Sequence, residues 1–333
     1  MDAKNKNGPL KGLIVIDLTR VLAGPYASMI LSDLGARIIK VEPPLGDDSR
    51  EFSPFVNNQS AYFASLNREK ESIKLDLKSE KDKLIFEELI KNADILLENY
   101  KPGTMEKLGY GYKSLSKKYP NLIYASCSGF GQTGPWATKP AYDMIVQGMG
   151  GLMSVTGHEG QEPVRVGTSI GDITAGLFTT IGILASLIDK NKHGNGQAID
   201  VSMLDCQIAI LENAIARYFA TGESPPPGGS RHPAIAPFEC YRCKDGYIVM
   251  ACGNNAMFER MCRAINKDEL IEDERFKTNP KRVENVISLK QELENLFVTK
   301  PSVFWIKVLE KENIPIGPLN NIEQAVNSEQ IKA

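Results

Sequence analysis

Short apolar runs alternate with longer amphipathic stretches along the first two hundred residues. The apolar runs that predict strands lie at residues 13–18, 37–41, 72–77, 94–98, 121–126 and 198–202. The stretches in which apolar positions recur at helical spacing lie between them, at residues 26–35, 79–93, 104–119 and 173–190. Strands that alternate with helices predict an α/β fold, here a doubly wound, Rossmann-like sheet that is mostly parallel.

The pattern changes beyond residue 204, which indicates a second domain. One long helix is predicted at about 205–221, and the Pro- and Gly-rich segment Ser224–Ser230 is the clearest linker signal in the chain. A hairpin and three helices follow, at residues 238–252, 255–265, 287–297 and 302–312. We therefore expect a large Rossmann-like domain over 1–204, a helix and linker over 205–230, a smaller α+β domain over 231–300, and a linker or returning segment over 301–333.

Composition and charge place the chain among globular proteins. It is 42% hydrophobic and 24% charged, which argues against a disordered or collagen-like chain. A formal net charge of −2 gives no electrostatic drive toward nucleic acid, so we expect no nucleic-acid partner. Residues 1–7 carry no apolar signal-peptide core, and the longest apolar stretch, at 175–188, is too short to span a bilayer. We expect a cytoplasmic protein that does not enter a membrane.

The cysteines and histidines do not form a metal-binding pattern. Six cysteines in a chain of this length are too few for a disulfide scaffold, and the three histidines are scattered. The single C-x-x-C, at Cys240 and Cys243, falls in the predicted hairpin, where positions three apart point to opposite faces. A structural zinc ion is therefore the weaker alternative, and we expect no metal and reduced thiols.

Two glycine-containing turns follow predicted strands. Gly129–Gly134 matches the G-x-G-x-x-G pattern of dinucleotide sites, but Pro135 and Pro140 stand where the phosphate-binding helix should begin, so we expect no nicotinamide cofactor. Thr19–Pro25 follows the first strand directly. Ligands of such folds bind at the carboxyl ends of strands, and Gly24 would let a ligand approach the backbone, although an ordinary tight turn has the same pattern.

The segment around Asp172 admits a structural and a catalytic interpretation. Asp172 stands immediately before the helix predicted at 173–190, where its side chain could simply cap the helix. The alternative is a carboxylate nucleophile exposed at a strand-to-helix junction. Upstream, Gly148, Gly150 and Gly151 lie close together, and their amides could stabilise an oxyanion.

Taken together, these segments resemble the family III CoA-transferases, the CaiB/BaiF type, over about residues 10–321. The matching stretches include Asp17–Pro25, Lys40–Pro43, Asn67–Lys70, Glu98–Gly103, Ser128–Pro135, Ala141–Asp143 and the Gly171–Asp172 pair. Each stretch is short, but their order and spacing together are specific. Within the family, the chain is most similar to dicarboxylate-type members that resemble succinate–hydroxymethylglutarate CoA-transferase.

The resemblance implies an enzyme that moves CoA between an acyl-CoA donor and a small carboxylic acid. A succinyl-CoA-type dicarboxylate donor is favoured. Asp172 would be the catalytic aspartate and would form a covalent acyl-aspartyl intermediate. CoA is then a substrate, and neither a cofactor nor a metal is required. Family members are interlocked homodimers, so we expect this chain to form a homodimer.

The resemblance also implies which residues contact CoA. They are Val21, Leu22, Ala23, Leu75, Lys78, Asn99, Tyr100, Lys101, Lys107, Tyr142 and Asp143. The first three would line the turn after the first strand, and Tyr142 and Asp143 would border the pantetheine arm. The lysines would face phosphate groups, although a solvated surface lysine is the ordinary alternative for each.

The chain departs from the family pattern at several points. Pro43 and Pro44 stand where some members have an arginine, and Lys107 replaces an arginine without its bidentate fork. Segment 228–233 is shorter than the glycine-rich lid of formyl-CoA transferases, which counts against oxalate as the acceptor. The chain ends at Ala333, before the segment by which family members return to the large domain, so we expect that return to be absent.

Two other functions stay open on the sequence alone. An acyl-CoA racemase of the same fold would need a histidine–aspartate pair, for which His158 and Asp143 are the nearest candidates. A non-catalytic CoA-binding protein would need no reactive carboxylate at position 172. The sequence also does not decide which arginine holds a substrate carboxylate among Arg20, Arg165 and Arg231.

Overall fold

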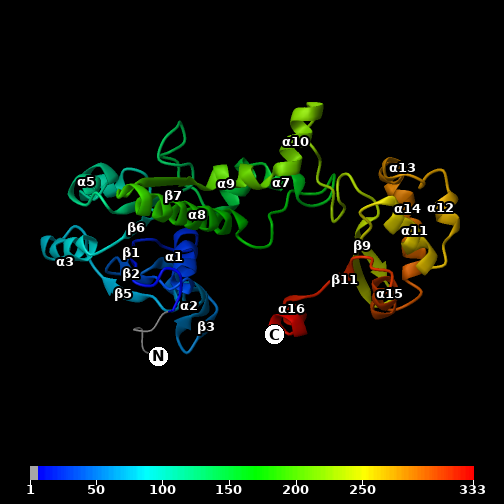
Figure 1. Cartoon of the computed structure of the whole chain (residues 1–333), viewed down its shortest axis with the longest axis horizontal. Helices are drawn as coiled ribbons and strands as arrows, with labels where there is room; N and C mark the ends of the chain where they lie inside the picture. Colours follow the sequence, from blue (N-terminus) through cyan, green and yellow to red (C-terminus); the bar gives the residue numbers. More distant parts are fainter. Residues whose placement is uncertain (1–6) are drawn as a thin grey trace. The chain divides into compact units, whose positions relative to one another are not determined.

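The computed structural model describes residues 7–333, which fold into two compact units (Figure 1). The larger unit contains the residues up to Thr156 together with Glu162–Pro226, and the smaller contains Gly157–Gln161 together with Pro227–Ala333. The boundary at residue 226 falls inside the 205–230 segment, where a helix and a linker were predicted. Pro and Gly residues explain its position, because neither continues a helix.

The larger unit is built on one six-stranded parallel sheet, which confirms the predicted fold class. Its strands are β1 (Ile14–Asp17), β2 (Arg37–Glu42), β5 (Glu71–Lys74), β6 (Ile95–Glu98), β7 (Ile123–Ser128) and β8 (Ala198–Ser202). They lie in the order β5-β2-β1-β6-β7-β8, and each corresponds to a predicted strand. The direction of winding reverses between β1 and β6, and ligands of doubly wound sheets bind outside the strand ends at such a point.

Helices cover both faces of this sheet, because successive strand residues point to opposite sides. On one face, Ile16 and Leu96 pack against Phe86 of α3 (Glu80–Lys91). On the other face, Val15 and Leu97 pack against α1 (Ala23–Asp33) and α8 (Ile170–His193). The sheet therefore forms the middle layer of the unit.

Two predicted helices are each divided. The stretch 104–119 forms α4 (Thr104–Leu108) and α5 (Tyr112–Lys118), because Gly109 adopts a φ of 88° and ends α4. The stretch 205–221 forms α9 (Met203–Ile210) and α10 (Glu212–Thr221). The other elements of this unit are the 3-10 helix η2 (Asp48–Glu51), β3 (Phe55–Val56), β4 (Gln59–Ser60), α2 (Ala61–Asn67), α6 (Asp143–Met149) and α7 (Leu152–Val155).

Helix α8 carries Asp172. It begins at Ile170, three residues earlier than predicted, so Asp172 lies in its first turn. By length and composition alone, α8 could cross a membrane, but half of its most apolar window is buried inside the protein. It packs there against α1, α9, β7 and β8, which are the contacts of a core helix.

The smaller unit is an antiparallel sheet with helices. β9 (Phe238–Cys243) and β10 (Gly246–Ala251) form the predicted hairpin, and β11 (Ile316–Pro318) pairs with β10. The helices are α11 (Asn255–Ala264), α12 (Glu269–Glu272), α13 (Asn279–Glu284), α14 (Val286–Phe297), α15 (Ser302–Glu310), α16 (Ile322–Val326) and α17 (Glu329–Lys332). Helix α15 and β11 lie in the 301–333 stretch that was expected to be a linker or returning segment. They belong to this unit because Trp305, Leu309 and Ile314 are buried in its core.

The cysteines of the hairpin lie as the strand pattern predicts. Cys243 is buried on the core side of β9, whereas Cys240 is half-buried on the other side. All six cysteines are free thiols. Across residues 7–333, no group of three or more His, Cys, Asp or Glu side chains is placed to hold a metal ion.

Candidate active site

A pocket of about 320 Å³ opens at the carboxyl ends of β1, β6 and β7, beside the reversal of the sheet. The expected site residues that line it are Val21, Leu22, Ala23, Asn99, Tyr100, Lys101, Tyr142 and Asp172. They come from turns and helix starts that are far apart in the sequence. The structure therefore brings the first turn, the segment after β6 and the start of α8 to one place.

Asp172 does not cap its helix. The N-cap of α8 is Ser169, and Asp172 is the third residue of the first turn. The amide of Gly171 is satisfied by Asp143, whose Oδ1 accepts it at 2.8 Å. The interpretation of Asp172 as a helix cap is therefore wrong, and its side chain forms part of the pocket wall.

The surroundings of Asp172 raise its pKa to about 7. Burial is the largest cause, because it disfavours the charged form, and the negative charge of Asp143 adds to it. A hydrogen bond from the backbone amide of Ala23 acts in the opposite direction and lowers the pKa. A carboxylate with such a pKa is more basic than an ordinary aspartate, which makes it a better nucleophile once it is ionised.

This raised pKa predicts a pH-dependent cost to stability. The folded protein holds the Asp172 proton more tightly than the unfolded chain, whose aspartates have a pKa of about 4, so stability from this group is lost as the pH rises through about 7. We expect Asp172→Asn to raise the free energy of unfolding by about 1–2 kcal/mol at pH 8 and by little at pH 4. Urea unfolding measures this, with the exposed Glu310→Gln as control. Equal effects at the two pH values would contradict the prediction.

Asp143 is buried and does not line the pocket, so its expected place beside the pantetheine arm stays a prediction. One of its oxygens holds the amide of Gly171, and its Oδ2 accepts a hydrogen bond from Gln147 Nε2 at 2.7 Å. Gln147 Oε1 in turn accepts the amide of Val166 at 2.9 Å. Its Oδ1 thus holds the first turn of α8, and its Oδ2 orients the side chain that holds the segment before α8.

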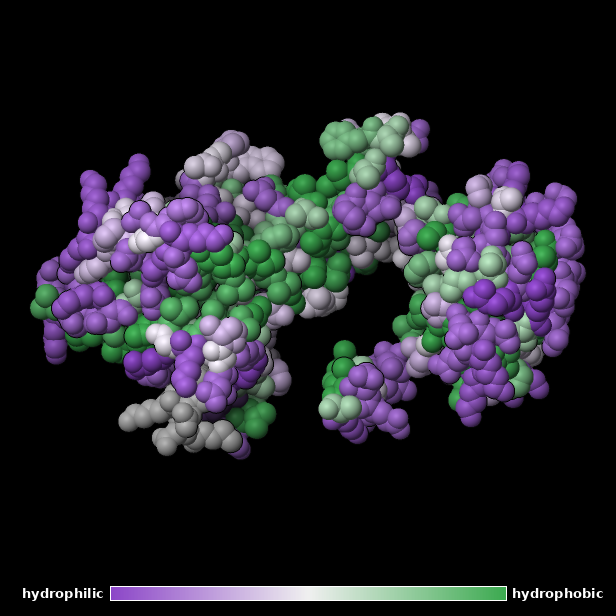
Figure 2. All heavy atoms as spheres, viewed as in Figure 1, coloured by the Kyte–Doolittle hydropathy of each residue, from purple (hydrophilic) through white to green (hydrophobic). Residues whose placement is uncertain are grey.

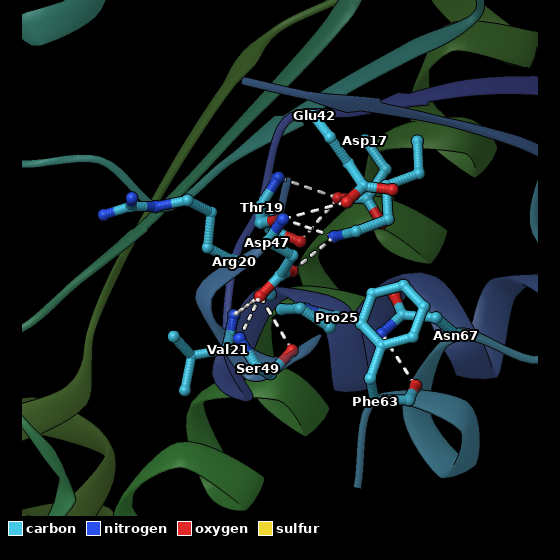
Figure 3. Close-up of polar contacts among 12 residues, drawn as sticks. Asp17, Thr19, Arg20, Val21, Pro25, Glu42, Asp47, Ser49, Phe63 and Asn67 are labelled. Atoms are coloured by element: carbon cyan, nitrogen blue, oxygen red, sulfur yellow. Dashed lines mark hydrogen bonds and ion pairs between the residues drawn. The ribbon is translucent and has the colours of Figure 1, made fainter. Parts of the chain in front are cut away.

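The turn between β1 and α1 has an unusual conformation at Val21. Its φ is 66°, in the left-handed region that β-branched residues rarely adopt. Asn99 fixes the preceding residue, since its Oδ1 accepts the Arg20 amide and its Nδ2 donates to the Arg20 carbonyl, both at 2.8 Å. Asp47 Oδ1 accepts the amide of Val21 at 3.2 Å (Figure 3). Asn99 therefore holds the turn as well as lining the pocket.

Three basic side chains line the pocket. Arg20 forms an ion pair with Asp48, in which Nη1 and Oδ2 are 3.1 Å apart. Lys101 and Lys139 have no acidic partner in the described part of the chain, although Lys139 Nζ lies 4.8 Å from the centre of the Trp136 ring. Unpaired cations on a pocket wall suit an anionic ligand such as a phosphate.

Leu75, Lys78 and Lys107 do not line this pocket. Leu75 is buried in the hydrophobic core on the α3 side of the sheet, whereas the two lysines are exposed. Their expected contacts with CoA stay predictions.

The three glycines expected to form an oxyanion site also lie outside the pocket wall. The amide of Gly150 donates to Val146 O at 2.8 Å, and that of Gly151 to Gly148 O at 3.4 Å. Gly150 has a packing role, because a Cβ there would come within 2.7 Å of Gln207 Cβ. Since two of the three amides are already paired, the geometry gives no support to an oxyanion role.

Sequence reasoning missed several residues that line the pocket: Asp48, Cys127, Ser128, Gly129, Lys139 and Met203. Cys127 and Ser128 end β7, and the rule that ligands bind at the carboxyl ends of parallel strands could have found them. The buried hydroxyl of Ser128 has no hydrogen-bond partner among residues 7–333, so it is available to a ligand. Asp48 and Lys139 lie on connections whose course no sequence pattern predicts.

The residues of the competing interpretations lie elsewhere. His158 belongs to the smaller unit, where it lines a pocket of about 140 Å³ together with Arg231. Arg165 is exposed and donates to the carbonyl of the next residue. In the G-x-G-x-x-G loop, the amide of Gln132 donates to the Asp200 carboxylate at 2.9 Å, so it is not free to hold a phosphate.

Comparisons with known proteins agree on one family. The model of CoA-transferase family III matches residues 10–333. An acetyl-CoA:oxalate CoA-transferase from Acetobacter aceti is 47% identical, over 98% of this chain and 84% of that protein. A succinyl-CoA:glutarate CoA-transferase from Homo sapiens is 40% identical, over 98% of this chain and 75% of that protein. The crystal structure of a CaiB/BaiF family protein from Brucella suis has a TM-score of 0.88 and 40% identity, covering 98% of this chain and 88% of that one.

Proposed function

Since the chain belongs to CoA-transferase family III, we propose that it transfers CoA through a covalent intermediate on Asp172. The protein is an enzyme that moves CoA between an acyl-CoA and a carboxylate. The observation that carries the finer proposal is the position of Asp172. It caps no helix, it lies in the pocket wall beside the β1–α1 turn, and its pKa is raised to about 7.

In the proposed reaction, the Asp172 carboxylate attacks the acyl-CoA carbonyl and expels CoA as a thiolate, which leaves an acyl-aspartyl anhydride. The thiolate attacks the aspartyl carbonyl, so the donor acid leaves with one Asp172 oxygen and an aspartyl-CoA thioester remains. The acceptor carboxylate displaces the thiolate to give a second anhydride. Attack of the thiolate on the acceptor carbonyl then forms the new acyl-CoA and regenerates Asp172. Each step replaces one activated acyl bond, a thioester or an anhydride, by another, so the scheme requires no ATP, metal or cofactor.

The proposed donor is succinyl-CoA and the proposed acceptor a short dicarboxylate. The name of the human relative, succinyl-CoA:glutarate CoA-transferase, supports both assignments. Oxalate belongs in the acceptor panel as well. The short segment 228–233 was expected to count against it, but oxalate is named for the relative that is 47% identical. Measuring kcat/KM for each combination of donor (succinyl-CoA or acetyl-CoA) and acceptor (glutarate or oxalate) would show which pair the enzyme prefers.

Trapping with hydroxylamine tests the covalent intermediate. Hydroxylamine attacks the aspartyl carbonyl of either intermediate and releases the acid or the thiol, leaving an aspartyl hydroxamate. After incubation with succinyl-CoA and hydroxylamine, the proposal predicts this adduct on the peptide that contains Asp172 and none in Asp172→Ala. Absence of the adduct with both succinyl-CoA and acetyl-CoA, in a protein that binds CoA, would overturn the proposal.

The unpaired pocket lysines are the proposed partners of the CoA phosphates. We expect Lys139→Ala to raise KM for the acyl-CoA by about three- to fivefold, the amount that one partly solvated ion pair contributes. The difference should shrink at high salt, because the charges are screened. Lys113→Ala, at an exposed position of α5, is the control. A KM for Lys139→Ala equal to that of the control would rule the contact out.

A homodimer, interlocked as in the family, is the proposed assembly. The support is an apolar face of α8 on which Leu177, Ile181 and Ile188 are 42%, 59% and 59% exposed. Figure 2 shows hydrophobic residues gathered over this part of the larger unit. Such a face favours burial against a second chain. Sedimentation of the full chain at micromolar concentration gives the mass that decides between monomer and dimer.

A further inference from the structure

A cluster of buried charges lies next to the β1–α1 turn without touching the pocket (Figure 3). Lys40 Nζ lies 2.8 Å from Asp47 Oδ2, and both side chains are only 1% exposed. In a second pair, Lys70 Nζ lies 3.4 Å from Asp17 Oδ2, and these side chains are equally buried. Buried ion pairs seldom add net stability over apolar side chains of the same size, so these pairs call for an explanation other than stability alone.

The Lys40–Asp47 pair holds the peptide groups of the turn. Lys40 Nζ donates to the Thr19 carbonyl at 2.7 Å, and Asp47 Oδ1 accepts the amide of Val21 at 3.2 Å. Between them, Asn99 holds the amide and the carbonyl of Arg20. The left-handed conformation is strained for a β-branched residue and persists only where the surroundings hold it. For Val21, the Lys40–Asp47 pair and Asn99 hold the backbone in this conformation.

The turn leads directly to the reacting carboxylate. Two residues beyond Val21, Ala23 lines the pocket wall together with Asp172, and its backbone amide favours the charged form of that carboxylate, lowering its pKa. The backbones of the two helices also approach closely there, because a Cβ at Gly176 would come within 2.7 Å of Ala23 O. A change in the backbone at Val21 would therefore move a donor that contacts Asp172.

We propose that the Lys40–Asp47 ion pair positions the catalytic carboxylate: it holds Val21 in its left-handed conformation and thereby keeps the Ala23 amide on Asp172. Asp47 and Lys40 are positioning residues, since neither lines the pocket. This inference rests on the proposed role of Asp172 as the nucleophile.

The proposal predicts a change in the pH dependence of acylation. Asp172 faces Asp143 from α6, Tyr62 from α2 and Cys127 from β7, and none of these stabilises its negative charge. The Ala23 amide is the group that favours the charged form. If the amide moves away, the pKa of Asp172 rises and the carboxylate is formed only at higher pH.

Asp47→Asn, made in the full chain, tests this. The readout is the single-turnover rate of hydroxamate formation on Asp172 with succinyl-CoA, measured as a function of pH. Loss of one hydrogen bond to a carboxylate should move the pH midpoint of acylation upward by about one pH unit. At pH 7 the ionised fraction of Asp172, and with it the acylation rate, should then fall by about fivefold. Asp47→Glu, which keeps the charge but displaces the carboxylate, should fall between this variant and the wild type, and it serves if Asp47→Asn does not fold.

A second substitution separates positioning from a general structural effect. Glycine adopts the left-handed conformation without strain, so Val21→Gly combined with Asp47→Asn should recover most of the lost acylation rate. The control is Glu239→Gln in the smaller unit, which breaks the ion pair between the buried Glu239 and the partly exposed Lys290. This variant should lower the free energy of unfolding and leave the pH midpoint of Asp172 acylation unchanged.

The outcomes distinguish the two proposals. If the wild type forms no Asp172 adduct, the proposed function fails, whatever the variants do. If the wild type forms the adduct and Asp47→Asn keeps its rate and midpoint, the positioning role is overturned. The same holds if Asp47→Asn is impaired and Val21→Gly restores nothing, because the effect would then not pass through the conformation of the turn.

Discussion

Asp172→Asn should lower kcat for CoA transfer by about 10⁴-fold or more, because an amide cannot form the anhydride that carries the acyl group. Binding of CoA should change by less than about threefold, since Asp172 is one of many residues that line the pocket. Steady-state rates with succinyl-CoA and glutarate give the first quantity, and calorimetric titration with CoA gives the second.

The control for this variant lies on the same helix. Asp189 is exposed near the end of α8, and Asp189→Asn removes an equal charge far along the helix from the pocket. It should leave kcat unchanged. A loss of only tenfold in Asp172→Asn, with Asp172→Ala behaving alike, would mean that another group carries the acyl chain.

Lys70→Met should reduce the free energy of unfolding by about 3–5 kcal/mol at pH 7, which makes it the largest stability effect that we expect. Lys70 Nζ donates to Ser28 Oγ at 2.7 Å, to Asn67 Oδ1 at 2.9 Å and to Pro25 O at 3.0 Å, and it lies 3.4 Å from Asp17. Its removal leaves a buried carboxylate with one cation fewer. Urea unfolding of the full chain measures the loss.

The pH dependence of this loss has a defined sign. Burial alone would raise the pKa of Asp17, but Lys70 and Lys40 lower it to about 2. The stability that Asp17 contributes is thus present above about pH 4 and is lost as the pH falls toward 2. The difference between Lys70→Met and the wild type should therefore shrink in acid. Lys74→Met, at an exposed position of β5, is the control, and a loss below 1 kcal/mol at pH 7 would contradict the account.

The strands could be predicted because the sheet is buried on both faces. Runs such as 13–18 and 94–98 are nearly continuously apolar, and their length and spacing match a parallel sheet. The start of α8 could not be predicted in the same way. Its first turn is stabilised by Asp143, 28 positions away in the chain, and no local pattern reports a cap from such a distance.

The sequence placed at the pocket those residues that directly follow strands. It did not predict the roles of residues that depend on hydrogen-bond or packing partners elsewhere in the chain. Val21–Ala23 and Asn99–Lys101 follow β1 and β6 and line the pocket as expected. Asp143 was assigned from the family resemblance and Gly150 from its place among neighbouring glycines. In the structure, Asp143 holds the amide of Gly171, and Gly150 packs closely against Gln207. The burial of Lys40 was not predicted, because a lysine in a strand is ordinarily solvated. Its partners, Asp47 and the Thr19 carbonyl, lie on other segments of the chain.

The most direct test of the central claim follows an oxygen atom. In the proposed scheme, each turnover transfers one oxygen of the acceptor carboxylate to Asp172 and one oxygen of Asp172 to the released donor acid. After many turnovers with succinyl-CoA and glutarate labelled with oxygen-18 in its carboxylates, mass spectrometry should find oxygen-18 in the peptide that contains Asp172. Transfer without an enzyme-bound intermediate would send the label straight to succinate. Labelled succinate together with an unlabelled Asp172 peptide would contradict the covalent mechanism.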